Sequence, residues 1–212
     1  MFPSISIEEE AKKVGFFILP PNIEEFIAHI GFQNTLYPFW HDKLKNIYPD
    51  PIHVNHNFII LTGAIGTGKS TMSKIMALYT LAKLLCLKNF DYFKLAITKP
   101  IGFLFFHVNI GKANVEFTEF VRDFYETNSF FKELKKIRKR YKLPEIPVNF
   151  AADGIKSNNA IGSDVIFFVF SEANFVNSEM ILNKIDQAHK RFKSRFLEAM
   201  PYIGNILIDT SS

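Results

Sequence analysis

Residues 58–71 read Phe-Ile-Ile-Leu-Thr-Gly-Ala-Ile-Gly-Thr-Gly-Lys-Ser-Thr. The first four residues predict a core strand, and residues 69–87 carry apolar side chains at helical spacing. Between them, Gly63 to Ser70 match G-x-x-x-x-G-K-S, a pattern that indicates a phosphate-binding loop when a strand precedes it and a helix follows. This stretch therefore predicts that the chain binds a nucleoside triphosphate.

Each part of the loop has an expected role. Its glycines let successive backbone N–H groups form a nest for anionic oxygens, and the helix that follows adds its positive end. Lys69 is expected to reach the β- and γ-phosphates, and the Ser70 hydroxyl to ligate Mg²⁺. ATP and Mg²⁺ are thus the expected cofactors. The residues expected to hold the nucleotide are Gly63, Ala64, Ile65, Gly66, Thr67, Gly68, Lys69, Ser70 and Thr71.

Apolar segments alternate with amphipathic ones along the rest of the chain. Strands are expected at residues 58–61, 101–108, 146–151, 164–170 and 204–208, and helices at residues 23–30, 41–48, 69–87, 114–125, 130–141 and 178–200. Strands that are apolar throughout are typical of a parallel sheet covered on both faces. The pattern predicts an α/β P-loop NTPase fold, with three α/β/α layers and a mostly parallel sheet of the RecA-like or ASCE type. Residues 1–50 are expected to form an N-terminal helical lead-in, and residues 51–212 the ATPase domain.

Composition sets the broad class of the protein. A chain of 212 residues with 48% hydrophobic and 22% charged residues is expected to fold around a sizeable core, to which its 24 Phe contribute. The formal charge of +4 suits a nucleic-acid partner without requiring one. A single cysteine, Cys86, excludes a disulfide framework and favours a reducing compartment. With no signal peptide, membrane-length apolar run or zinc spacing in the sequence, we expect a soluble intracellular protein.

Hydrolysis needs a carboxylate near Mg²⁺ and a base that orients water. The apolar segment 164–170 ends in Ser171-Glu172, where P-loop ATPases normally carry Asp-Glu. We expect Glu172 to be the catalytic base, and Ser70, Ser171 and Glu172 to form the metal site. Because Ser171 adds no negative charge, weaker Mg²⁺ binding or a displaced carboxylate is expected. The alternative interpretation is a solvated strand end.

The last expected strand ends in hydroxyl residues, Thr210, Ser211 and Ser212. Such a cluster can sense the γ-phosphate and relay its loss to a moving subdomain. Ser and Thr also commonly begin loops, which is the alternative. Because the chain stops directly after a core strand, we expect it to be a fragment of a longer protein.

Taken together, these residues resemble the ATPase domain of the tailed-bacteriophage large terminases, which package viral DNA. The resemblance covers about residues 35 to 212 and depends on the order of several short stretches. These are Tyr-Pro-Phe-Trp at 37–40, Ser-Phe-Phe at 129–131, Ala-Ile-Gly-Ser-Asp-Val-Ile at 160–166, Ser-Glu-Ala-Asn-Phe at 171–175, Lys-Arg-Phe-Lys-Ser-Arg-Phe at 190–196, and the strand with its coupling motif at 205–212.

The resemblance implies further partners and residues. It implies double-stranded DNA, a portal protein and a small terminase subunit as partners, a homo-oligomeric ring as the working form, the host cytoplasm as location, and no membrane. It also implies an arginine supplied by a neighbouring subunit, with Arg191 and Arg195 as catalytic candidates beside Arg138 and Arg140; each can equally be a surface charge. Gln33 is expected to contact adenine, the alternative being a surface glutamine. A nuclease domain, absent here, would follow Ser212.

Two departures from the family pattern bear on activity. Ile65 stands where the family often has an arginine, and Ser171 stands where it has an aspartate. The second departure puts strong hydrolysis in doubt and leaves nucleotide binding intact. Two alternatives therefore remain open: a helicase-like P-loop ATPase of another mobile element, and a nucleotide-binding domain with weak or no hydrolysis.

Overall fold

The computed structural model describes residues 6–64, 66–93, 100–153, 164–172 and 179–211. Five strands form one sheet in the order β1-β5-β4-β2-β3, and every neighbouring pair is parallel. This confirms the expected α/β fold with a parallel sheet and all five expected strands. The strands are β1 Phe58–Gly63, β2 Ile101–His107, β3 Val148–Asp153, β4 Asp164–Ser171 and β5 Asn205–Ser211.

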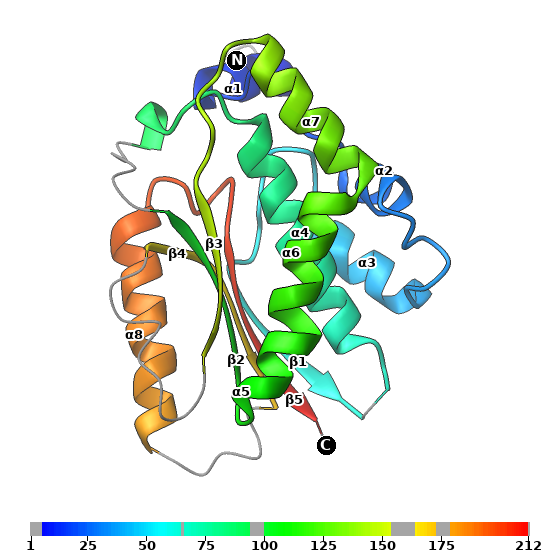
Figure 1. The fold of residues 1–212 in the computed structure, drawn as a ribbon, viewed down its shortest axis with the longest axis vertical. Coiled ribbons are helices and arrows are strands. Elements are labelled where there is room, and N and C mark those ends of the chain that lie inside the picture. The colour runs from blue at the N-terminus through cyan, green and yellow to red at the C-terminus, as the bar shows by residue number, and fades with distance from the viewer. Residues whose placement is uncertain (1–5, 65, 94–99, 154–163, 173–178, 212) are drawn as a thin grey trace, which may run out of the picture.

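Helices cover both faces of this sheet. Figure 1 shows α8 against one face and α4, with α5 to α7 beside it, on the other, which gives the three expected layers. The helices are α1 Ile7–Val14, α2 Ile23–His29, α3 Pro38–Ile47, α4 Lys69–Cys86, α5 Ile110–Ala113, α6 Phe120–Thr127, α7 Ser129–Arg140 and α8 Glu179–Phe196, with a 3-10 turn at Asp91–Phe93 and a π-helical turn at Asn114–Glu119. None of the helices in the described part of the chain combines the length and the apolarity that a membrane crossing requires.

Two neighbouring interior strands, β2 and β4, hold six of the 24 phenylalanines. Every residue of β2 is buried, and so is every residue of β4 after Asp164. Phenylalanines from the two strands stack across the sheet, with ring centroids 4.5 Å apart for Phe106 and Phe170 and 5.7 Å apart for Phe103 and Phe167. Because helices cover both faces of these strands, their side chains are apolar on both sides and do not alternate.

The N-terminal helices join the same core. Capping boxes start α1 at Ser6 and α2 at Asn22, and buried side chains of α1, α2 and α3 form one cluster with those of the sheet. The start of α3 differs from the expectation, since the helix begins at Pro38 and not at residue 41. Proline suits the first helical position because its fixed φ matches the helix and its missing N–H has no partner there. As a result, Trp40 lies in the first turn of α3.

The parallel arrangement brings the carboxyl ends of all strands to one edge of the sheet, at the bottom of Figure 1. The loop after β1 and the polar end of β4 lie at this edge, and β5 is inserted between these two strands. Ligands of open α/β sheets bind outside the carboxyl ends of the strands. The candidate site is therefore built at this edge.

Candidate nucleotide-binding site

Three glycines in the loop between β1 and α4 have positive φ angles. Gly63, Gly66 and Gly68 have φ angles of 145°, 83° and 88°, a region that side chains make costly. Gly68 is the N-cap of α4, and no side chain of the described residues caps that helix end. The first N–H groups of a helix have no partner within the helix, so this end presents donors and a positive dipole to an anion.

The side chain of Lys69 lies against its own loop. Its Nζ donates hydrogen bonds to the carbonyl oxygens of Gly63 (2.7 Å) and Ala64 (2.9 Å), and the residue is 5% exposed. Thr67 Oγ1 donates to the same Ala64 carbonyl over 2.9 Å. The ammonium group of Lys69 has three N–H donors. Bound phosphate oxygens would compete with the two carbonyl oxygens for these donors.

The first turn of α3 packs on the loop, a contact that sequence reasoning missed. Trp40 Nε1 donates to the carbonyl oxygen of Thr67 over 2.6 Å. A Cβ placed on Gly68 would lie 3.1 Å from that nitrogen and 3.3 Å from Cδ2 of Tyr37. The only signal in the sequence was the aromatic stretch at residues 37–40. Gln33 is exposed in the turn between α2 and α3, and its contact with adenine stays a prediction.

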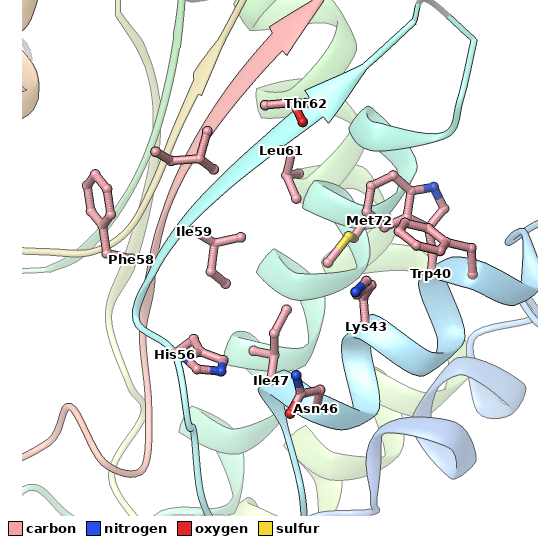
Figure 2. A pocket seen from close by; sticks show the side chains of 12 residues that line it. Trp40, Lys43, Asn46, Ile47, His56, Phe58, Ile59, Leu61, Thr62 and Met72 are labelled. Carbon is pink, nitrogen blue, oxygen red and sulfur yellow. The ribbon is translucent and has the colours of Figure 1, made fainter.

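A pocket of about 390 Å³ lies along the outer edge of β1. Figure 2 shows Trp40, Met72 and Thr62 toward one end, and His56 and Asn46 toward the other. Trp40 lines this pocket and also bonds to Thr67 of the loop, so one side chain borders both. It is lined by residues of α3, of β1 with the segment before it, and of α4: Phe39, Trp40, Lys43, Asn46, Ile47, His56, Phe58, Ile59, Ile60, Leu61, Thr62 and Met72.

Glu172 follows β4 directly at the same edge of the sheet. Its backbone has a φ of 58°, which is uncommon for a residue with a side chain, and the side chain is 32% exposed. Its Oε2 lies 2.8 Å from Nε2 of His107, the last residue of β2, which the sequence reasoning had not singled out. Ser171 is buried, and its Cα pairs with that of His107. The carboxylate is thus held at the sheet edge and does not point into the apolar interior.

The candidate metal ligands suit Mg²⁺ chemically. All three side chains offer oxygen. Ser70 lies in the first turn of α4, Ser171 is the last residue of β4, and Glu172 follows it. Mg²⁺ is usually bound through one or two carboxylates together with phosphates and waters, without a dedicated protein cage. Among the residues that the structure describes, no group of three His, Cys, Asp or Glu side chains gathers as a metal site.

The end of β5 runs beside the phosphate-binding loop. Thr210 pairs with Thr62 and Ser211 pairs with Gly63, and for both hydroxyl residues the structure describes the backbone alone. The expected coupling segment is therefore next to the first glycine of the loop. Residues Ile65 and Ser212 lie outside the described part of the chain, as do residues 160–163 and 173–175 of the quoted stretches.

The arginines of α8 lie away from the loop of their own chain. Arg195 Nη2 is 3.3 Å from Oδ2 of Asp164, which is the first residue of β4 and so belongs to the opposite, amino edge of the sheet. Arg191 precedes it by about one helical turn. A catalytic role of either arginine would therefore have to be exercised on a neighbouring subunit, and it stays a prediction.

Arg138 is neither a neighbour's catalytic arginine nor a surface charge, and both interpretations of it are wrong. The residue is 4% exposed, and its guanidinium donates to the carbonyl oxygens of Leu85 (2.9 Å), Leu87 and Pro144. Leu85 and Leu87 lie at the C-terminal end of α4, where the last carbonyls have no partner within the helix. Arg138 therefore caps α4 from inside the fold, whereas Arg140 is exposed.

Comparison with known proteins gives a structural similarity and no match in sequence. No protein-family profile and no curated protein matches the chain. Among solved structures, the chain is similar to the large terminase from a thermophilic bacteriophage, with a TM-score of 0.38 and 11% sequence identity. The similarity covers 90% of this chain and 39% of that terminase, so the chain spans well under half of its length.

Proposed function

We propose that this chain is a Mg²⁺-dependent ATPase. The observation that carries the proposal is the shared sheet edge: the G-x-x-x-x-G-K-S loop follows β1, Glu172 follows β4, and β5 adjoins both strands. A phosphate-binding loop alone indicates nucleotide binding. A partly exposed carboxylate at the same edge adds the group that hydrolysis requires.

Each residue has a definite task in this proposal. The N–H groups of the loop and of the first turn of α4 bind the phosphates, and Lys69 stabilises the charge on the β- and γ-phosphates. Ser70, with Ser171 and Glu172, would hold Mg²⁺, which neutralises charge on the phosphate oxygens. Glu172 orients the attacking water and accepts its proton.

A more specific proposal is a motor that uses ATP hydrolysis to translocate double-stranded DNA, as in phage packaging terminases. The order of the short sequence stretches and the mild positive charge support it. The pairing of Ser211 with Gly63 supports coupling, because a strand end beside the loop can move when the γ-phosphate leaves. The portal protein, the small terminase subunit, the homo-oligomeric ring and the host cytoplasm belong to this proposal.

One observation favours a second candidate, a nucleotide-binding domain with little or no hydrolysis. Ser171 is buried at the end of β4 in the place where a carboxylate is expected, so the site holds one negative charge fewer for Mg²⁺. Nucleotide affinity depends mainly on the loop and would persist. Turnover would then be absent at any Mg²⁺ concentration.

Steady-state ATP hydrolysis with Mg²⁺, with and without double-stranded DNA, tests these proposals. We expect Lys69→Ala to abolish turnover and weaken ATP binding, and Glu172→Gln to reduce kcat by about 100-fold or more while ATP still binds. The exposed residues Lys12 and Glu133 provide matched controls, Lys12→Ala and Glu133→Gln. Full activity of Glu172→Gln would remove Glu172 from the role of base.

Two further results distinguish the specific proposals. Stimulation of turnover by double-stranded DNA supports the motor, and strand displacement without such stimulation supports a helicase-like enzyme. Binding of ATP with no turnover at any Mg²⁺ concentration supports the second candidate and contradicts the ATPase.

A further inference from the structure

We propose that His107 is a positioning residue that holds the Glu172 carboxylate in its working orientation. The proposal depends on the ATPase activity proposed above and adds a residue to its machinery. It starts from the 2.8 Å contact between His107 Nε2 and Glu172 Oε2. These two residues are 65 positions apart in the chain and meet because β2 and β4 are neighbours in the sheet.

The hydrogen bonds of the imidazole ring define its tautomer. The backbone N–H of Asn109 donates to His107 Nδ1 over 2.8 Å, so Nδ1 is an acceptor and carries no proton. In the neutral ring the proton is then on Nε2, which donates it to Glu172. The contact is thus a directed hydrogen bond to the carboxylate.

The imidazole ring of His107 is held in place by burial and by the fixed position of Asn109. His107 is 3% exposed at the end of a fully buried strand. Asn109, which binds Nδ1, is itself fixed, because its Oδ1 accepts hydrogen bonds from the N–H groups of Gly111 and Lys112 at the start of α5. With both nitrogens engaged and the ring buried, His107 is suited to orient the carboxylate beside it.

Glu172, in contrast, needs such a partner. It lies just beyond β4, where the strand ladder no longer fixes the backbone, and its φ of 58° is a conformation that persists only when the surroundings impose it. Its side chain is 32% exposed, so it would otherwise sample several rotamers. The bond from His107 engages Oε2 and leaves Oε1 to accept a hydrogen bond from water.

The expected consequence is a loss of turnover without a loss of nucleotide affinity. Small displacements of a catalytic group can cost about 100-fold in rate, so losing the donor is expected to reduce kcat by about 10- to 100-fold. Within the described part of the chain, the side chain of His107 bonds to Glu172 and Asn109, and neither belongs to the loop between β1 and α4. The dissociation constant of a non-hydrolysable ATP analogue should therefore change by less than about twofold.

The test compares two variants of similar size in the whole chain. His107→Gln keeps an N–H donor near the position of Nε2, whereas His107→Met fills similar space without one. We expect His107→Met to show the 10- to 100-fold fall in kcat and His107→Gln to recover most of it. Thermal unfolding of both variants reports folding, and His29→Ala, which removes an exposed histidine on α2, is the control.

Combination with Glu172→Gln tests whether His107 acts through Glu172. If it does, His107→Met should lower kcat no further in the Glu172→Gln background, because residues that act as a unit are not additive.

Several outcomes would overturn the proposal. They are an unchanged or raised kcat in His107→Met, equal losses in His107→Met and His107→Gln, and an additive loss in the double variant. Failure of both variants to fold would show that His107 is a structural residue. If the unmodified chain has no ATPase activity, or if Glu172→Gln is fully active, the proposed function fails first and this inference falls with it.

Discussion

The indole Nε1 of Trp40 donates a hydrogen bond to the carbonyl oxygen of Thr67, over 2.6 Å. It joins the first turn of α3 to the phosphate-binding loop, across 27 positions of the chain. Trp40 also lies against Gly68, the N-cap residue of α4. The loop is thus supported from outside by a residue whose fluorescence can be measured, and Trp40 is the only tryptophan in the chain.

ATP binding is expected to change the fluorescence of Trp40, because phosphate binding shifts the loop whose carbonyl the indole contacts. Titration with a non-hydrolysable ATP analogue should give a saturable change in intensity or emission maximum. Lys69→Ala should show little change over the same concentration range. A saturable signal of equal size and affinity in Lys69→Ala would contradict binding at this loop.

Loss of Arg138 is expected to affect stability and not catalysis. In Arg138→Met, the buried carbonyls of Leu85 and Leu87 and the partly buried carbonyl of Pro144 lose their donor, at a cost of about 1–3 kcal/mol for a buried group left unsatisfied. Urea unfolding should show the loss, while kcat per folded molecule stays unchanged. Arg140→Met, at an exposed position nearby, is the control and should be neutral. A large fall in kcat at unchanged stability would restore Arg138 as a catalytic candidate.

Lys83 makes the stability of the fold depend on pH. Burial between the rings of Tyr48 and Tyr79 lowers the pKa of Lys83 from 10.5 to about 7, and its Nζ donates to the carbonyl of Ile52 over 2.8 Å. Between these two pKa values the unfolded chain binds a proton that the folded chain does not. The free energy of unfolding therefore rises with pH across this window, by up to about 1.4 kcal/mol per pH unit.

Urea unfolding at about pH 7.5 and about pH 9 measures this contribution. The unmodified chain should gain about 2 kcal/mol over the interval, and Lys83→Met should lack that share of the increase. Lys12→Met, at an exposed position of α1, should behave like the unmodified chain. An identical pH dependence in Lys83→Met and the unmodified chain would show that the buried amine keeps an ordinary pKa.

Gly204 is expected to tolerate no side chain. Its φ is 91°, and a Cβ there would lie 2.7 Å from both the carbonyl oxygen of Ile166 and Cε2 of Phe192. Backbone strain and overpacking together predict that Gly204→Ala lowers the free energy of unfolding by about 3 kcal/mol or more. Gly31→Ala is the matched control, because Gly31 has a φ of 78° with nothing within 4 Å of its Cβ position.

Gly31→Ala should cost about 1–2 kcal/mol, the backbone share alone. Equal losses in the two variants would show that the contacts of Gly204 with Ile166 and Phe192 do not matter.

Local patterns in the chain were sufficient for its five strands, for α4 and for the glycine-rich loop, but not for α1 or for the start of α3. The apolar runs that became β2 and β4, the helical periodicity of α4 and the glycines of the loop are all short-range signals. They depend on the backbone conformation of each segment and on which of its faces are buried. The expectation of a parallel α/β sheet followed from them, because strands that are apolar on both sides need cover on both faces.

The pairing of distant side chains was settled by packing in three dimensions. His107 meets Glu172 because β2 and β4 are neighbours in register, Trp40 meets Thr67 because α3 folds back on the loop, and Arg138 lies under the end of α4 instead of on the surface. None of these contacts has a local signature. Each contact depends on the order of the strands and on how the helices pack against the sheet. Periodicity along the chain carries no information about either.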